Sequence, residues 1–211
     1  MAACMKEALP DAGNPGVSDA DPETIEPMEF VVTIKKDVSG KVYFQKGNSE
    51  RLFPRNGYEF TEECRALGSF LIYPVEEPGY GRICDIEWLE EIDKGLVVSN
   101  SSVGFEDGID VNLQSRKTSI EDGYLTVHYN AWWGENAGHH DIWLVNIGHG
   151  EFNLVHEAHS DAKDIYAEGL VYFDINSLLP ATDDVPLTIT VNWLTTTGGI
   201  TSSKFGFISR K

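Results

Sequence analysis

Histidine is the residue type in this chain that could best support metal chemistry, and all six histidines lie in the second half of the sequence. Neutral imidazole is a common zinc ligand. The densest group is HEAH at residues 156–159, but a zincin site needs two residues between its Glu and its second His, on a helix. A composite site of His128, His140 and His156 would make the chain a metal-dependent hydrolase. The simpler expectation, which we adopt, is ordinary surface histidines with no metal and no other cofactor.

Other signatures of catalysis are missing from the sequence. His139 and His140 are adjacent, so on a strand they would point to opposite faces and could not readily chelate one ion together. The chain has no G-x-S-x-G nucleophile pattern and no Cys beside a His. Calcium binding by DGIDVN at residues 107–112 is conceivable, but the segment lacks the EF-hand pattern. We therefore predict that the protein is not an enzyme.

Aromatic side chains are the remaining candidates for binding. Tyr124, His128 and Trp132 lie four residues apart along one predicted strand, so they share one face, which we expect to be directed to solvent. Flat Trp and Tyr rings stack on sugar faces or fill pockets in a partner protein. We take these three residues as candidate binding residues for a glycan or a protein. The alternative is that Trp132 packs between two domains or beneath a loop.

The stretch GYLTVHYNAWWGENAGHHDIWLVNI at residues 123–147 must position these side chains. Two runs alternate with a period of two around a polar, glycine-bearing connection, which is typical of an antiparallel hairpin. One face of the first run is apolar and should enter the core; it consists of Leu125, Val127, Tyr129, Ala131 and Trp133. The other face should contact water; it consists of Tyr124, Thr126, His128, Asn130 and Trp132.

The rest of the chain predicts an all-β protein. Residues 29–97 contain about five short strands, with Gly68 at a bulge or bend, which is typical of a small OB-type barrel. Residues 119–211 repeat hairpins, one of them joined through TTTGGITSS, which is typical of an antiparallel β-sandwich. Residues 98–118 read as a linker with one possible short strand. Residues 1–28 are acidic, contain Pro and Gly, and should form a flexible tether.

Cysteine usage leaves one question open within the first domain. Cys64 and Cys84 are both expected in the barrel, where they would form a disulfide that stabilises a small core by about 2 to 4 kcal/mol. The alternative, which we favour slightly, is a pair of buried free thiols that pack as small apolar groups.

Charge excludes one large class of partner. The formal net charge is −18, from 16 basic and 34 acidic residues. Binding to nucleic acid requires clustered Lys and Arg against the phosphates, so we expect no nucleic-acid partner. No apolar run approaches the roughly 20 residues that span a bilayer. The acidic surface is expected to keep the protein monomeric.

Several segments resemble the NigD-like proteins, a family of secreted lipoproteins from Gram-negative anaerobes. The resemblance lies in YLTVHYNAWWGENAGHHDIWLVN, ALGSFLIYPVEE, GRICDIEWLEEIDKGLV and LVYFDINSLLP, and it covers nearly everything after the tether. It implies an N-terminal OB domain followed by a C-terminal β-sandwich. It implies no catalytic residues, because none is established for the family.

A lipid anchor is predicted at Cys4. MAAC places two small residues directly before a cysteine, as at the cleavage point of a lipoprotein signal, and an acidic segment follows. Diacylglycerol and an amide-linked acyl chain would contribute about 0.8 kcal/mol per buried methylene, which is enough for stable anchoring. We therefore expect a cell-envelope protein, an outer-membrane lipoprotein that contacts the membrane only through this anchor.

Overall fold

The computed structural model describes residues 25–77, 81–99, 104–135, 138–183 and 185–210. Cys4 and most of the expected tether lie outside these ranges. Among the described residues, no helix is long and apolar enough to cross a bilayer.

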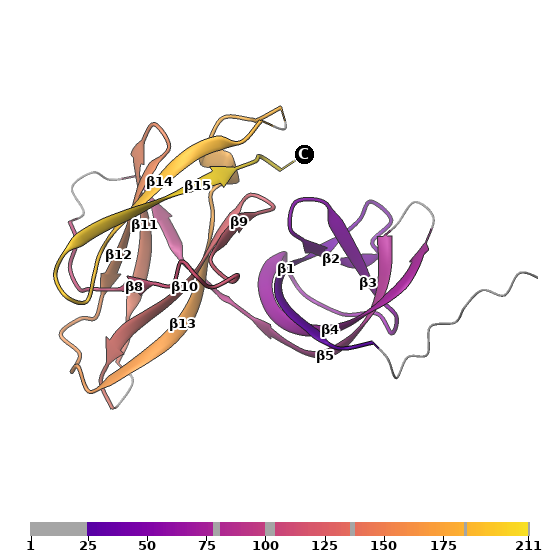
Figure 1. Ribbon diagram of the computed structural model, residues 1–211, viewed down its shortest axis with the longest axis horizontal. Helices are drawn as coiled ribbons and strands as arrows, with labels where there is room; N and C mark the ends of the chain where they lie inside the picture. The colour runs from indigo at the N-terminus through magenta and orange to yellow at the C-terminus, as the bar shows by residue number, and fades with distance from the viewer. Residues whose placement is uncertain (1–24, 78–80, 100–103, 136–137, 184, 211) are drawn as a thin grey trace, which may run out of the picture.

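The first domain is a closed barrel of five strands in the order β1-β2-β3-β5-β4 (Figure 1). The strands are β1 (Met28–Lys36), β2 (Val42–Lys46), β3 (Glu50–Pro54), β4 (Cys64–Glu77) and β5 (Gly81–Glu91). β1 pairs antiparallel with both β2 and β4, and β3 pairs parallel with β5, which closes the sheet. The predicted small barrel is confirmed.

Gly68 allows β4 and β5 to approach each other closely inside the barrel. A Cβ atom at this position would lie 2.6 Å from Leu89 Cδ1 and 2.9 Å from the backbone oxygen of Trp88. The β4–β5 register shifts just beyond it, between Ser69 and Phe70. The expected bulge therefore lies where a residue without a side chain is needed.

The second domain is a β-sandwich, as predicted. One sheet has the order β6-β13-β10-β8, with β9 also paired to β10, and the other has the order β15-β14-β12-β11-β7. The first sheet contains β6 (Asp93–Lys94), β8 (Asp110–Val111), β9 (Ser119–Glu121), β10 (Tyr124–Trp133) and β13 (Ile165–Asp174). The second contains β7 (Leu96–Val98), β11 (Asp141–Gly148), β12 (Glu151–Glu157), β14 (Leu187–Leu194) and β15 (Ile200–Phe207). A short 3-10 helix, η2 (Asn176–Leu178), follows β13.

The sheets differ from the prediction in their pairing. β10 and β11 do not form the expected hairpin, because β10 pairs with β13 and β11 pairs with β12, in the opposite sheet. Both strands turn an apolar face to the same core, so alternation cannot distinguish a hairpin from a crossing between sheets. Three pairings, β7–β11, β12–β14 and β6–β13, are parallel, so neither sheet is purely antiparallel. The predicted β14–β15 hairpin is present, with Gly198 at φ 89°.

The expected domain boundaries also differ in detail. β5 ends at Glu91, and β6 and β7, which we placed in the barrel, already pair with sandwich strands. The possible short strand expected within residues 98–118 is present as β8, which pairs with β10. β6 and β7, of two and three residues, have too few side chains to display an alternating pattern and could not be assigned from the sequence.

The sandwich core contains the apolar face predicted for β10. Leu125, Val127, Tyr129 and Ala131 are buried there, and Trp133 packs against the same cluster while remaining partly exposed. Aromatic residues from both sheets complete this core; they include Phe152, Phe173, Trp193 and Phe207.

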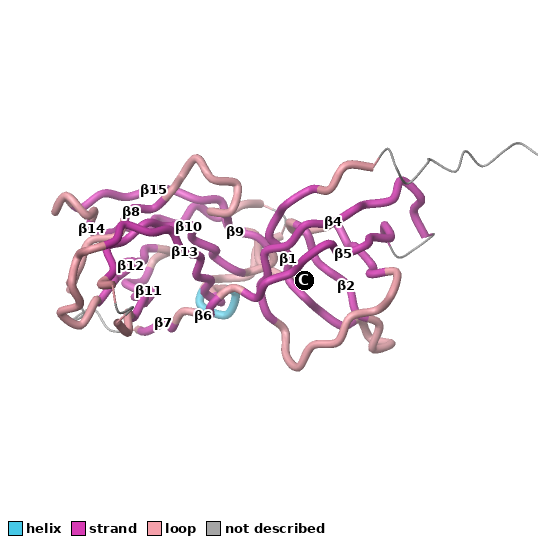
Figure 2. Tube along the Cα trace, turned by 90° about the horizontal axis from the view of Figure 1, so that it is seen from below, coloured by secondary structure: helices cyan, strands magenta, loops and turns pink. Residues whose placement is uncertain are grey.

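The barrel packs side by side with one end of the sandwich (Figure 2). Arg65 on β4 is fully buried and donates hydrogen bonds to Thr126 Oγ1 at 3.2 Å and Glu121 Oε2 at 3.3 Å, both in the sandwich. Lys35 on β1 forms an ion pair of 3.1 Å with Asp122. Thr126, expected to contact water, is therefore buried, because the barrel covers this end of the strand face.

Candidate functional site

Tyr124 lies in the contact between the two domains and not on the free surface. It begins β10, is 4% exposed, and donates a hydrogen bond of 2.6 Å to Glu63 Oε1 of the barrel. The Arg210 guanidinium lies 4.4 Å from its ring centroid, and Tyr172 packs edge-on at 5.4 Å. Burial and the hydrogen bond to Glu63 raise the pKa of Tyr124. A ligand could not reach this ring, so the expectation that Tyr124 binds one is corrected.

His128, the second candidate, lies midway along β10. Its Nε2 atom is 2.9 Å from Glu168 Oε2 on the neighbouring strand β13, and its Nδ1 atom is buried without a hydrogen-bond partner among the described residues. It lines a cavity of about 280 Å³ between the domains, together with Leu67 and Lys117. His128 is therefore a mostly buried side chain held by Glu168, and it does not stand free on the surface.

Trp132 is exposed at the opposite end of β10. It is 37% exposed, and its ring packs against Tyr166 of β13 with a centroid separation of 5.2 Å. Tyr166 is 46% exposed and donates a hydrogen bond of 2.7 Å to Asp110 Oδ2. Ile165, 49% exposed, adjoins the pair in sequence. We call Trp132 and Tyr166 the aromatic platform.

Asp110 holds the aromatic platform in place. Besides the Tyr166 hydroxyl, it accepts hydrogen bonds from the hydroxyl and the backbone N–H of Thr196, in the β14–β15 turn. Burial opposes ionisation of Asp110, but the hydrogen bonds from Thr196 and Tyr166 outweigh it and lower the pKa of this carboxyl. The tilt of the Tyr166 ring is thus set by a carboxylate from another strand.

Calcium binding by residues 107–112 finds no support in the geometry. Asp107 accepts a hydrogen bond from Ala158 N at 3.0 Å, and Asn112 Oδ1 accepts from Ser115 N at 3.1 Å. Asp110 accepts from Tyr166 and Thr196, so the side-chain oxygens of this segment are engaged in hydrogen bonds to three separate parts of the chain.

Two histidines of the predicted composite site form a buried chain of hydrogen bonds. His156 Nδ1 lies 3.1 Å from Gly108 O, His156 Nε2 lies 2.8 Å from His140 Nδ1, and His140 Nε2 lies 3.0 Å from Asp161 Oδ2. Trp133 stacks on the His140 ring at 3.9 Å. Burial lowers the pKa of His156, and hydrogen bonds from Gly134 N and His140 lower that of Asp161.

All four ring nitrogens of this chain already face a partner: His156 Nδ1 faces Gly108 O, His156 Nε2 faces His140 Nδ1, and His140 Nε2 faces Asp161 Oδ2. A metal ion at these histidines would have to displace at least one of these contacts. His128 contacts Glu168 instead of His140 or His156. The composite site of His128, His140 and His156 is therefore wrong.

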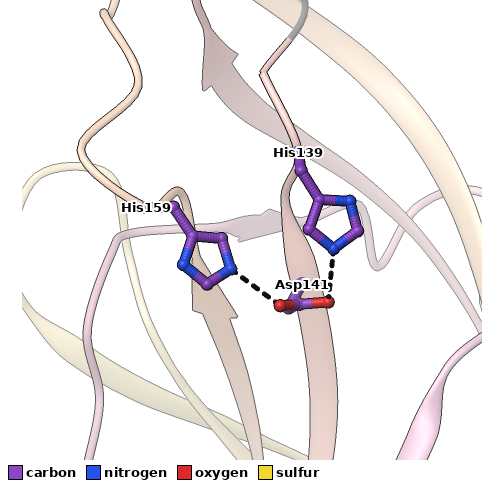
Figure 3. Close-up of side chains that lie close together, drawn as sticks. All are labelled: His139, Asp141 and His159. Atoms are coloured by element: carbon purple, nitrogen blue, oxygen red, sulfur yellow. Dashed lines mark hydrogen bonds and ion pairs between the residues drawn. The ribbon is translucent and has the colours of Figure 1, made fainter.

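A different histidine cluster lies on the surface next to this chain. His139 Nε2 is 3.1 Å from Asp141 Oδ1, and His159 Nε2 is 2.7 Å from Asp141 Oδ2 (Figure 3). The two imidazole rings are nearly parallel, with an interplanar angle of 13° and a centroid separation of 5.8 Å. The hydrogen bond with Asp141 raises the pKa of His159 and lowers that of Asp141. We call these three residues the surface histidine cluster.

Strand register and one tight turn bring the surface histidine cluster together. Asp141 begins β11 and lies opposite Glu157 at the end of β12. His139 lies two residues before β11 begins, and His159 lies two residues after β12 ends, so both histidines follow from the same end of the paired strands. The backbone turns at His159 and Ser160, whose φ angles are 49° and 65°. We did not predict this cluster, although H-x-D at residues 139–141 and E-x-H at residues 157–159 carry the relevant spacing.

The cysteines of the barrel are free thiols. Cys64 and Cys84 are both buried and unpaired, and both pack in the barrel core. Burial raises the pKa of Cys64 to about 11 and that of Cys84 to about 12. The disulfide is therefore not formed in this structure, and the alternative of two buried thiols describes it. Cys4 lies outside the described residues.

A closed five-stranded barrel joined to a mixed β-sandwich defines a two-domain, all-β class of protein. Residues 99–207, more than half of the chain, match the model of the NigD-like C-terminal beta sandwich domain. The chain therefore belongs to the NigD-like family. No protein with a curated description matches it.

Solved structures share this fold at low sequence identity. A proposed toxin-related protein from Parabacteroides distasonis is 20% identical, with a TM-score of 0.68 over 87% of this chain and 94% of that one. A NigD-like immunity protein from Bacteroides caccae is 16% identical, with a TM-score of 0.58 over 86% and 97%. A proposed lipoprotein from Bacteroides fragilis is 11% identical, with a TM-score of 0.64 over 88% and 100%. These likenesses concern the fold of both domains together.

Proposed function

We propose that this protein is a non-enzymatic binding or accessory module of the cell envelope, which presents one end of its sandwich to a glycan or a protein. The aromatic platform carries the proposal. Trp132 and Tyr166 are large rings that remain 37% and 46% exposed although the core of the same domain buries most of its aromatic residues. Paired exposed rings favour stacking on a sugar or insertion into a partner's pocket.

The position of the aromatic platform supports a display role. Tyr124, at the start of β10, contacts the barrel, whereas Trp132 lies eight residues further along the same strand, roughly 25 Å away. β10 and β13 extend away from the barrel toward this end (Figure 1). The first described strand, β1, belongs to the barrel, on the opposite side of the molecule from this end of β10 and β13 (Figure 1).

The contact between the domains supports a fixed orientation of the platform. Arg65 and Lys35 of the barrel bind sandwich residues, and Arg210 near the C-terminus donates to Glu63 of the barrel at 2.5 Å. Fully buried and paired polar groups tolerate few alternative arrangements, because any displacement leaves them unsatisfied. The sandwich is thus held on the barrel and does not swing freely.

Attachment to the envelope is proposed through Cys4. The MAAC sequence supports it, and so does the likeness to the proposed lipoprotein from Bacteroides fragilis. We place the protein as a monomer in the outer membrane. The native precursor, expressed in its own host with labelled palmitate, should incorporate label and partition into detergent. An unlabelled, aqueous protein would contradict the anchor.

Binding is tested with a glycan array and with cross-linking to envelope extracts of the host. The parent protein is compared with Trp132→Ala and Tyr166→Ala, which should weaken binding at least tenfold. Trp88→Ala is the matched control, because Trp88 is 41% exposed but lies on β5 of the barrel. It should bind like the parent. No signal in either assay, or full binding by Trp132→Ala, would remove the proposal.

A further inference from the structure

The surface histidine cluster has the ligand set of a transition-metal site. His139, Asp141 and His159 each offer one ligand atom, and these atoms all lie within 4.8 Å of one another. Two imidazoles and one carboxylate, with remaining positions open to water, form a ligand set that Zn²⁺ accepts in proteins. Both imidazoles direct the same nitrogen, Nε2, toward the carboxylate of Asp141 (Figure 3).

The spacing of these atoms is close to what an ion requires. Ligand atoms at about 2.0 to 2.2 Å from a tetrahedral Zn²⁺ are separated by about 3.3 Å. The two imidazole-to-carboxylate distances, 3.1 and 2.7 Å, are already near this value. The widest separation must shrink by at most about 1.5 Å, from the 4.8 Å limit. His139 can move by this amount because its side chain is 80% exposed.

A second carboxylate orients one of the imidazoles. Glu157 Oε1 lies 3.3 Å from His159 Nδ1, on the side of the ring opposite the nitrogen that faces Asp141. A histidine that binds metal through one nitrogen usually donates the N–H of the other to a carboxylate, which fixes the ring and its tautomer. Glu157 occupies that position, and its strand pairing with Asp141 holds it there.

The charge environment also favours a cation. Within the described part of the chain, both ion-pair partners of Asp141 are histidines. Asp122, by contrast, is paired with the ammonium group of Lys35 and the guanidinium group of Arg210, which are donors only. A neutral imidazole can exchange its contact with Asp141 for a metal bond, whereas a lysine or arginine cannot. The net charge of −18 further attracts divalent cations.

We propose that His139, Asp141 and His159 bind one Zn²⁺ ion, with Glu157 as the residue that positions His159. Nothing in this proposal depends on the aromatic platform or on a bound glycan. The remaining coordination positions face solvent, since the three side chains are 80%, 30% and 43% exposed. Water occupies them in the isolated protein.

The test measures Zn²⁺ binding to the full chain, freed of metal by chelator and dialysis, by calorimetry and by elemental analysis after gel filtration. All proteins carry Cys4→Ser, so that this thiol cannot contribute a ligand. We expect one Zn²⁺ per chain. His139→Ala and Asp141→Asn should each weaken binding at least tenfold, and Glu157→Gln by about tenfold. The third ligand, His159, is replaced by Asn in the variant His159→Asn, because Asn tolerates the positive φ of 49° found there.

His149→Asn is the matched control, because His149 is an exposed histidine in the turn that joins β11 to β12 and has the same kind of positive φ, 55°, as His159. It should bind Zn²⁺ as the parent does. Circular dichroism confirms that each variant is folded. Co²⁺ titration provides an independent readout of metal binding, since ligation of Co²⁺ by histidine and carboxylate produces visible d–d absorption. His139→Ala should lose this absorption. Absence of stoichiometric binding by the parent, or equal loss of binding in His149→Asn and His139→Ala, would overturn the proposal.

Discussion

Arg65 Nε lies 3.2 Å from Thr126 Oγ1, and this hydrogen bond joins barrel strand β4 to sandwich strand β10 in the fully buried contact between the domains. The same guanidinium donates to Thr33 Oγ1 at 3.1 Å and to Glu121 Oε2 at 3.3 Å. One side chain therefore satisfies acceptors in both domains. A buried cation without these partners would be strongly destabilising, so the two domains depend on each other at this point.

Arg65→Ala should destabilise the whole protein. The change leaves Thr33, Thr126 and Glu121 without their buried donor, and we expect the free energy of unfolding to fall by about 3 kcal/mol. Urea unfolding followed by tryptophan fluorescence measures the effect. Arg51→Ala is the control, because Arg51 is exposed and its guanidinium lies 4.9 Å from the centroid of the Tyr43 ring; the change should cost at most about 1 kcal/mol. Equal losses in the two variants would contradict a special role for Arg65.

The buried thiols should make the protein less stable at alkaline pH. Burial raises the pKa of Cys64 from 9.0 to about 11 and that of Cys84 from 9.0 to about 12. Above about pH 9 the unfolded chain releases these protons while the native barrel retains them, so rising pH favours unfolding. This contribution to stability is present below pH 9 and is lost toward pH 11 to 12. The expected slope is up to about 1.4 kcal/mol per pH unit for each thiol.

Cys84→Ala separates this effect from other alkaline titrations. The variant should begin slightly less stable, because it leaves a small cavity in the barrel core, but its free energy of unfolding should fall less steeply with pH. Urea unfolding at several pH values between about 8.5 and 10.5 provides the two slopes. Parallel slopes for the parent and Cys84→Ala would show that the thiol does not titrate as expected.

Gly68→Ala tests the close approach inside the barrel. The new Cβ would lie 2.6 Å from Leu89 Cδ1, 2.9 Å from Phe70 Cζ and 2.9 Å from the Trp88 backbone oxygen, and the backbone oxygen cannot rotate away. We expect a loss of about 2 kcal/mol in the free energy of unfolding. At Gly104 a Cβ would meet nothing within 4 Å, so Gly104→Ala should change stability by less than about 0.5 kcal/mol. Thermal or urea unfolding of both variants measures these changes in stability. An unchanged free energy of unfolding in Gly68→Ala would mean that β4 and β5 can separate without cost.

Much of the local structure was predictable because side-chain alternation reports which face of a strand is buried. Leu125, Val127, Tyr129 and Ala131 could be assigned to the core from their spacing alone, and they are buried. The alternation does not report which strand lies alongside. β10 and β11 both contribute to one core from opposite sheets, so a pattern that reads as a hairpin is equally compatible with a crossing between sheets.

The sequence by itself determined the all-β class, the order of the two domains, the family resemblance and the acidic surface. Only the tertiary structure decided which outward-facing residues remain accessible. Tyr124 and Trp132 alternate on the same face of β10, yet the barrel covers the first and leaves the second exposed. The surface histidine cluster likewise required the register of Asp141 with Glu157 and the turn at His159. Contacts between residues far apart in the chain depend on how strands pair and domains pack, and local spacing carries no record of either.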